Sequence, residues 1–158
     1  MAKKMQNNFI NIVLYSPEIP QNTGNIARLC VSNDLKLHLI EPLGFKLNDK
    51  YLKRSGLDYW QYLNFQTYKN WNEFIVQNPL ANLWLLTTKS SKSFWSAGFN
   101  SNDYLVFGPE TQGLPEELRN QYPEKCLTVP MSSRHARSLN LASTVQTVYY
   151  EAYRQLES

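Results

Sequence analysis

The sequence contains no long apolar run. The longest uninterrupted runs, such as residues 83–86, hold four apolar residues, whereas a helix needs about twenty to span a bilayer. The basic stretch at residues 1–8 leads into no apolar segment of the length that secretory signals have. We therefore expect no transmembrane helix, no secretion and no membrane partner.

Cysteine is scarce, and the spacings typical of metal sites are absent. The two cysteines, Cys30 and Cys126, stand among apolar neighbours, which favours buried thiols in a reducing, cytoplasmic compartment. Together with His38 and His135 they are scattered along the chain. Because no Cys-x-x-Cys or His-x-x-x-His spacing occurs, the sequence predicts no metal site.

The six glycines include no Gly-x-Gly pair. This absence excludes the common dinucleotide fingerprint and weighs against the glycine loop of Rossmann-type methyltransferases. Gly108 and Gly113 have the spacing of a P-loop, but Leu114 and Pro115 stand where that loop needs Lys and Ser or Thr. The Gly-x-Ser-x-Gly elbow of hydrolases is also missing. A nucleotide-like cofactor would therefore bind by another route.

What the sequence does contain is typical of one globular domain. The chain of 158 residues is 42% hydrophobic, 13% aromatic and 18% charged, with a net charge of +3. This length and composition predict a single domain over residues 1–158 with a sizeable core. The small basic excess permits a nucleic-acid partner without demonstrating one.

Apolar strand-like segments alternate with helical patterns along the chain. We predict strands at residues 9–15, 35–40, 63–68, 83–87, 104–107 and 126–129. We predict helices at residues 48–55, 71–77, 115–120 and 140–156, and one that Asn22 and Thr23 cap and that runs to about Asp34. The alternation predicts an α/β fold with a mostly parallel sheet that helices cover on both faces.

Three polar clusters follow predicted strands, at residues 17–28, 106–115 and 129–142. Ligands of open α/β sheets gather beyond the carboxyl ends of the strands. Because these segments are rich in Asn, Arg, Glu and Ser, they form the candidate site.

Each cluster also has a structural interpretation that needs no ligand. The first is a helix cap followed by a helix that carries Asn25 and Arg28 on one solvated face. The second is a glycine turn with an exposed Glu110. In the third, Ser138 or Asn140 caps the long helix. Taken singly, the clusters leave both interpretations open.

Together the clusters contain three motifs: Asn-x-Gly-Asn-x-x-Arg at residues 22–28, Phe-Gly-Pro-Glu-Thr-x-Gly-Leu-Pro at 107–115 and Pro-Met-x(5)-Arg-Ser-Leu-Asn-Leu at 130–141. In this order they resemble the motifs of SPOUT-superfamily RNA 2′-O-methyltransferases, and the similarity extends over residues 12–156. The sequence is most similar to the small single-domain branch that acts on C or U at position 34 of tRNA. Residues 132–136 make one loop longer than in the family and leave the motif intact.

The resemblance implies a SPOUT fold, in which the C-terminal part of the parallel sheet is threaded into a trefoil knot. It implies S-adenosyl-L-methionine as the cofactor, held in the knot loops mainly by backbone groups, and no metal. Such a site needs no Gly-x-Gly pair. By their positions in the family pattern, the cofactor-binding residues are Leu86, Thr87, Gly108, Val129 and Ser138.

The implied reaction transfers the methyl group of the cofactor to the ribose 2′-hydroxyl of the wobble nucleotide of tRNA. The motifs imply the catalytic residues Asn22, Arg28, Glu110, Ser138 and Asn140. A guanidinium stays protonated in proteins, so we expect Arg28 to bind phosphate or to stabilise the developing alkoxide. Glu110 is expected to fix a neighbouring strand end or Arg28, and Ser138 and Asn140 to shape the pocket.

The RNA partner is expected to be the anticodon stem-loop of tRNA. Basic side chains can meet phosphates while interleaved aromatic rings stack on unpaired bases. The same pattern is also typical of an amphipathic surface helix. The candidate RNA-binding residues are Lys50, Lys53, Arg54, Tyr59, Arg137 and Tyr150.

An apolar stripe in the last predicted helix bears on the oligomeric state. The stripe, at helical period, consists of Leu141, Val145, Val148, Tyr149, Ala152 and Leu156. A sheet face of the same monomer can cover it. The resemblance instead favours a homodimer that pairs through the first and last helices. In such a dimer Arg28 of one chain serves the cofactor site of the other.

Two other functions fit parts of the sequence. A non-catalytic RNA-binding protein of the same fold would not need the motif residues, which are all present here. A small serine hydrolase would use Ser138 and His135. These two residues are only three positions apart, and no partner carboxylate is evident near them.

Overall fold

A computed structural model describes residues 9–48, 50–55 and 59–157, without the side chains of residues 51, 53 and 55. Its described strands form one sheet, ordered β3-β2-β1-β5-β4-β6, and every neighbouring pair is parallel. The strands are β1 (Asn11–Tyr15), β2 (Lys36–Ile40), β3 (Asn64–Tyr68), β4 (Leu83–Leu86), β5 (Tyr104–Phe107) and β6 (Cys126–Leu127). The predicted parallel α/β sheet is confirmed. The trefoil knot stays a prediction.

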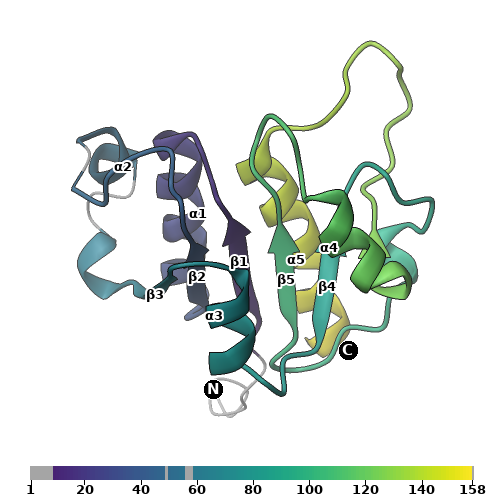
Figure 1. The fold of residues 1–158 in the computed structure, drawn as a ribbon, viewed down its shortest axis with the longest axis horizontal. Helices are drawn as coiled ribbons and strands as arrows, with labels where there is room; N and C mark the ends of the chain where they lie inside the picture. Colours follow the sequence, from purple (N-terminus) through teal and green to yellow (C-terminus); the bar gives the residue numbers. More distant parts are fainter. Residues whose placement is uncertain (1–8, 49, 56–58, 158) are drawn as a thin grey trace.

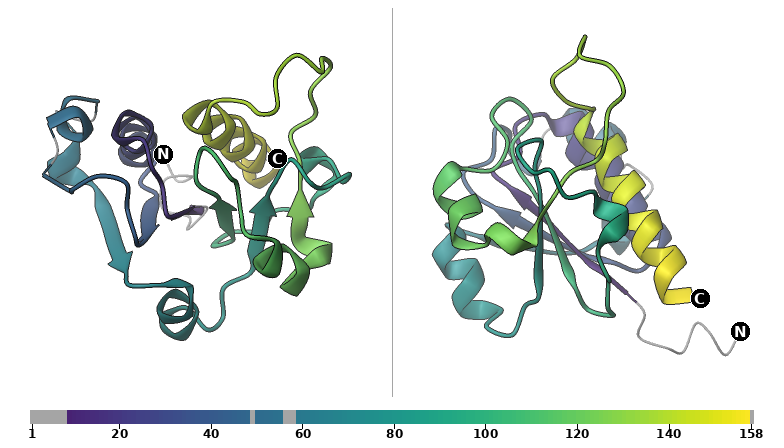
Figure 2. Two further views of the ribbon diagram at one scale, coloured as in Figure 1. Left: turned by 45° about the horizontal axis from the view of Figure 1, so that its top comes forward. Right: turned by 90° about the vertical axis from the view of Figure 1, so that its right-hand side faces the viewer.

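Helices cover both faces of the sheet, as predicted (Figure 1, Figure 2). The α-helices are α1 (Pro20–Ser32), α2 (Lys50–Ser55), α3 (Trp71–Gln77), α4 (Glu116–Gln121) and α5 (Leu141–Glu157). The short 3₁₀ helices are η2 (Trp60–Tyr62), η3 (Phe94–Ser96) and η4 (Pro123–Lys125). Helices α1 and α5 lie side by side on one face, and α3 and α4 lie on the other (Figure 2). No helix of the described residues is both long and apolar enough to cross a membrane.

The alternation of side chains along each central strand produces a core layer on either face. In β1, Ile12 and Leu14 pack into the layer under α1 and α5, whereas Val13 packs into the layer under α3 and α4. Both sides of the strand are therefore apolar. This double burial explains why the strands read as short continuous apolar runs rather than as alternating patterns.

Helix α1 begins two residues before Asn22, so the prediction that Asn22 and Thr23 cap it is wrong. Its first residue is Pro20, and Ile19 stands at the N-cap. Proline suits the first helical position because it has no N–H to leave unsatisfied and its φ is already helical. Asn22 and Thr23 consequently lie inside the helix and are buried.

The apolar stripe of α5 is covered within the monomer. Val145, Val148, Tyr149 and Ala152 are fully buried in the core layer that α5 shares with α1 and the sheet. The interpretation of this stripe as a dimer surface is therefore wrong. The exposed side chains on α5 include Tyr150 and Tyr153, which form an aromatic cluster with Tyr149.

A buried histidine makes the stability of this fold dependent on pH. His38 lies in β2, where Nε2 donates to Asn11 Oδ1 at 2.9 Å and Nδ1 accepts from the Tyr68 hydroxyl at 2.8 Å. Burial, with a smaller effect of the Lys36 charge, lowers the pKa of His38 from 6.5 to about 3. The folded protein thus keeps this imidazole neutral.

We expect acid to destabilise the protein through His38. Between pH 6.5 and about 3 the unfolded chain binds a proton here that the folded chain does not, so stability falls as pH falls. The loss reaches about 3 kcal/mol at pH 4. Urea unfolding at pH 7 and pH 4 measures it, with His38→Gln as the non-titrating control. Equal pH dependence of the two proteins would contradict the assignment.

Candidate active site

A cavity of about 720 Å³ opens at the carboxyl ends of β4, β5 and β6. Its walls come from the loops that follow these strands, at residues 86–89, 107–114 and 128–131, and from the approach to α5 at residues 137–141. Ile19 and Asn22, at the start of α1, close it on one side. The cavity therefore brings all three polar clusters of the sequence together.

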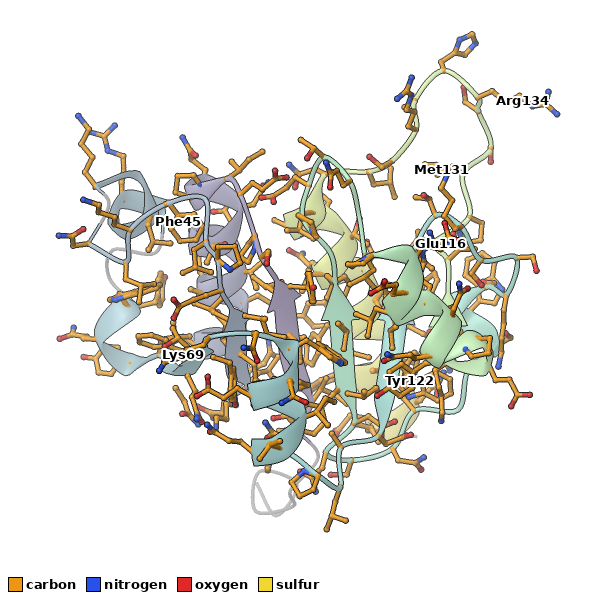
Figure 3. The ribbon with its side chains drawn as sticks, viewed as in Figure 1. Phe45, Lys69, Glu116, Tyr122, Met131 and Arg134 are labelled. Carbon is orange, nitrogen blue, oxygen red and sulfur yellow. The ribbon has the colours of Figure 1, made fainter. Side chains whose placement is uncertain are left out.

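All five residues predicted to bind the cofactor line this cavity. They are Leu86, Thr87, Gly108, Val129 and Ser138. Met131, Leu139 and Leu141 add apolar surface, and Met131 lies near the base of the loop that projects from the body of the protein (Figure 3). The mixture of apolar walls and a few polar groups is typical of a small-molecule site.

The buried Asn22 side chain links the three motifs. Its Nδ2 donates to Glu110 Oε2 at 3.2 Å, and its Oδ1 accepts from Asn140 Nδ2 at 3.1 Å. Asn140 in turn caps α5, since its Oδ1 accepts from the backbone N–H of Ser143 at 3.2 Å. The prediction that Ser138 or Asn140 caps the long helix is confirmed for Asn140.

Glu110 holds the start of α1 rather than Arg28. Its two carboxylate oxygens accept from the backbone N–H groups of Glu18 at 2.7 Å and Ile19 at 2.9 Å. No acidic residue lies in the first turn of α1, so Glu110 supplies the negative charge that a helix N-terminus favours. Of the two expected roles of Glu110, the carboxylate holds the loop that follows β1, and no contact with Arg28 is found among the described residues of one chain.

Glu18 is a site residue to which the sequence assigned no role. Its carboxylate accepts from the backbone N–H and the hydroxyl of Thr111, both at 2.9 Å. The carboxylate of Glu110, from the loop after β5, therefore holds the loop after β1, and the carboxylate of Glu18, from the loop after β1, holds the loop after β5. The available signal was the position of Glu18 in the first polar cluster, but its partner lies 93 residues along the chain.

Gly108 is required by the path of its own loop. A Cβ at this position would lie 2.3 Å from the backbone N of Leu114 and 2.4 Å from the carbonyl carbon of Gly113. The loop after β5 thus folds back onto the end of the strand. Residues 113 and 114 come so close to position 108 that only a residue without a side chain fits there. This close return places residues 108–114 along the cavity wall.

Arg28 is outside the cavity of its own chain. It lies six residues after Asn22 on α1, about 9 Å along the helix and on a different face, and its side chain is exposed. The guanidinium carbon lies 5.1 Å from the centre of the Tyr59 ring. The prediction that Asn25 and Arg28 lie on a solvated face of the helix is confirmed. The cavity of one chain therefore lacks the guanidinium that the motifs led us to expect there.

The structure separates the candidate RNA-binding residues into different places. Arg137 lines the cavity, together with Lys89 and Arg119, which the sequence did not single out. Lys50 and Arg54 are exposed on α2, whereas the side chain of Lys53 lies outside the described residues. Tyr59 stacks on Arg28 as stated above.

Tyr150 is not beside the third motif. It lies on α5, nine residues after the helix begins, which is about 13 Å along its axis. Its hydroxyl accepts from Asn33 Nδ2 at 3.3 Å, next to the C-terminal end of α1. The cavity instead meets the N-terminal ends of both helices, so the reason for proposing Tyr150 as an RNA contact is removed.

The hydrolase interpretation gains no support from the geometry. The loop of residues 131–139 is exposed, and Arg134 lies near its outer end (Figure 3). The backbone N–H of His135 donates to Ser133 Oγ at 3.1 Å, and no hydrogen bond among the described residues joins His135 to Ser138. The described ranges also contain no group of three or more His, Cys, Asp or Glu side chains that could hold a metal ion.

Comparisons with known proteins identify a family. Residues 9–150 match the family model described as the SpoU rRNA methylase family. A curated relative from Methylovorus glucosotrophus, named tRNA (cytidine(34)-2′-O)-methyltransferase, is 49% identical over 146 residues, which cover 92% of this chain and 94% of the relative.

Solved structures show the same fold. One, described as "Structural insights into the 2-OH methylation of C/U34 on tRNA", superposes with a TM-score of 0.91 at 42% identity and covers 96% of this chain and 99% of its own. The SpoU methyltransferase AviRb from Streptomyces viridochromogenes, in complex with the cofactor AdoMet, gives a TM-score of 0.84 at 21% identity. That match covers 97% of this chain and 60% of the other, and at this identity it supports the fold alone.

Proposed function

Because this chain belongs to the SpoU rRNA methylase family, we propose that it uses the cavity beyond β4, β5 and β6 to methylate tRNA. The protein is an S-adenosylmethionine-dependent methyltransferase that modifies the ribose 2′-hydroxyl of C or U at the wobble position, 34. The proposal is supported by relatives of similar length with that name and by the solved structure described for C/U34 methylation.

The observation that carries the proposal is the meeting of the three motifs around one cavity. Segments that start at residues 86, 107, 128 and 137 converge there, although they are far apart in the sequence. Asn22, at the start of α1, donates to Glu110 and accepts from Asn140, so hydrogen bonds join one residue of each motif directly. A generic helix cap or glycine turn would not need this convergence.

The residues present fit S-adenosylmethionine. The cavity has the volume of a site for a ligand of drug size. Leu86, Val129 and Met131 offer apolar surface to a purine ring, and Thr87, Thr128 and Ser138 add polar groups to the wall. When bound, the cofactor supplies a methyl group that is already activated on a sulfonium.

The chain's own residues then have to orient the ribose and favour loss of its 2′-hydroxyl proton. We assign the charge stabilisation to the Arg28 guanidinium, whose fork of N–H groups suits phosphate and alkoxide oxygens. Asn22, Glu110 and Asn140 keep the starts of α1 and α5 in place around the cavity. Ser138 lies on the cavity wall, where it shapes the pocket.

The position of Arg28 favours a homodimer. The guanidinium is exposed and outside its own cavity, so a partner subunit is the simplest route by which it reaches a cofactor. The exposed faces of α1 and α5, with Tyr150 and Tyr153, are the surfaces available for such pairing. They replace the buried α5 stripe as the proposed interface.

The proposed RNA partner is the anticodon stem-loop of tRNA, because the target nucleotide lies in it. Lys89 and Arg137 line the cavity and can meet the phosphates that flank this nucleotide. Lys50 and Arg54 extend the basic surface on α2. We place the reaction in the cytoplasm, which agrees with two buried, unpaired cysteines.

Calorimetric titration with S-adenosylhomocysteine and nucleoside analysis of tRNA test the function. Binding, together with loss of 2′-O-methylated C or U at position 34 from the tRNA of a deletion strain, is the expected result. A protein that binds tRNA and neither binds the cofactor product nor restores the modification would instead be the non-catalytic RNA-binding protein.

Complementation tests the shared site. At a cofactor concentration too low to load Gly108→Ala, we expect a mixture of the Arg28→Ala and Gly108→Ala proteins to regain about one quarter of the wild-type activity after random subunit exchange, because each heterodimer has one intact site. As the control, each variant is taken through the same exchange procedure without the other. Absence of recovery despite exchange demonstrated by mass spectrometry would refute a site built from two chains.

A further inference from the structure

We propose that Tyr59 is a positioning residue for Arg28, and that its ring holds the guanidinium ready to receive RNA. This role rests on the proposed function, because it acts through the cation that stabilises the reacting ribose. The observation that carries it is the stacking of Arg28 over the Tyr59 ring, at 5.1 Å from guanidinium carbon to ring centre.

The backbone that carries the Tyr59 ring is held in place by hydrogen bonding and by packing on the core. Tyr59 is half-buried directly before η2, and its carbonyl accepts from the backbone N–H of Tyr62 at 2.9 Å. The next residue, Trp60, packs against the core and against Phe65, with ring centres 5.4 Å apart. In both Figure 1 and the left view of Figure 2, α2 lies on the opposite side of α1 from α5. The Tyr59 ring is thus anchored next to α1 by η2 and by the packing of Trp60 on the core.

Stacking is well suited to this task. A carboxylate partner would occupy the N–H donors of the guanidinium and neutralise its charge, whereas a ring contacts only the face of the planar group. Arg28 is exposed, so its N–H groups are accessible to a phosphate or a ribose oxygen. Arginine also carries considerable rotamer entropy, and a side chain that is already stacked loses less of it when the substrate arrives.

The alternative is that Tyr59 stacks on an RNA base, as the charge and aromatic pattern of the sequence suggested. The two roles have different kinetic signatures. A ring that positions Arg28 affects kcat, because Arg28 acts in the transition state. A ring that binds RNA affects KM for tRNA and leaves kcat unchanged.

Kinetics of three variants test the role. We expect Tyr59→Leu to lower kcat about 3- to 30-fold, with the affinity for S-adenosylhomocysteine unchanged as proof of an intact fold. Tyr59→Phe keeps the ring and should stay within twofold of wild type. Tyr62→Leu is the matched control, because Tyr62 is a nearby aromatic residue that is 70% exposed. An unchanged kcat with raised KM in Tyr59→Leu would overturn the proposal.

A double-mutant cycle and NMR separate this inference from the proposed function. In the Arg28→Ala background, Tyr59→Leu should cost nothing further, since the two side chains act as one unit. The Nε–H resonance of Arg28 should move downfield in Tyr59→Leu, when the ring-current shift is lost, and not in Tyr59→Phe. A wild-type protein that methylates no tRNA would contradict the proposed function. Additive losses or an unmoved resonance in an active enzyme would overturn only the role of Tyr59.

Discussion

Replacing Arg28 by alanine should lower kcat for tRNA methylation about 10²- to 10³-fold while the affinity for S-adenosylhomocysteine stays unchanged. Loss of one charge-assisted contact that strengthens in the transition state costs about 3 to 4 kcal/mol, which corresponds to this factor. The affinity should not change because Arg28 does not line the cavity of its own chain, and in a partner's site it is assigned to the RNA oxygen rather than to the cofactor. The substitution should also leave stability intact, since the side chain is exposed.

Single-turnover kinetics with saturating cofactor measure the effect directly, and calorimetry provides the binding constant. Arg28→Lys should remain poor, because an ammonium reproduces neither the planar fork nor the stacking on Tyr59. Ser32→Ala is a suitable control, since Ser32 is exposed on the same helix and lies outside the motif. Activity of Arg28→Ala within threefold of wild type would show that another group stabilises the charge.

Replacing Gly108 by alanine should weaken cofactor binding at least tenfold and lower the melting temperature. A single methyl group at this position would overlap the backbone of Gly113 and Leu114. Overpacking of this kind typically costs about 1 to 3 kcal/mol, and it displaces the loop that carries Glu110. Since Leu114 is buried in the core layer under α4, the strain is not confined to the surface.

The matched control for Gly108 is Gly98→Ala, because a Cβ at Gly98 meets no atom within 4 Å. Titration of both variants with S-adenosylhomocysteine and thermal unfolding give the two readouts. The resemblance implied only that Gly108 binds the cofactor. In the structure a Cβ at position 108 already overlaps the protein's own backbone at residues 113 and 114. The single methyl group of alanine is therefore enough to disturb the loop. Wild-type affinity in Gly108→Ala would show that the loop is not part of the cofactor site.

The two substitutions are expected to fail in different ways. Arg28→Ala binds cofactor and does not turn over, whereas Gly108→Ala turns over slowly because it binds cofactor poorly and folds less stably. The difference follows from their locations, one exposed on α1 and one at the end of a buried strand. It also makes the pair suitable for the complementation experiment.

From the sequence, the parallel sheet, most helix and strand positions and many of the residues that line the cavity could be predicted. Parallel strands buried on both faces are short apolar runs, so β1, β4 and β5 could be recognised directly. The family resemblance gave all five cofactor-binding candidates, which the structure brings together. These features could be predicted because each strand, helix and motif is a pattern of residues that are close neighbours along the chain.

Which groups contact each exposed or apolar face could not be predicted and is settled by the fold. The periodicity of α5 marks an apolar stripe, but periodicity contains no information on whether a sheet or a second subunit covers it. The partners of Glu110 and Glu18 lie about 90 residues away in the sequence, and the need for glycine at position 108 arises from the return of residues 113 and 114. Such contacts depend on how the whole chain closes on itself, because distances in space between distant segments are set by the fold and not by local pattern.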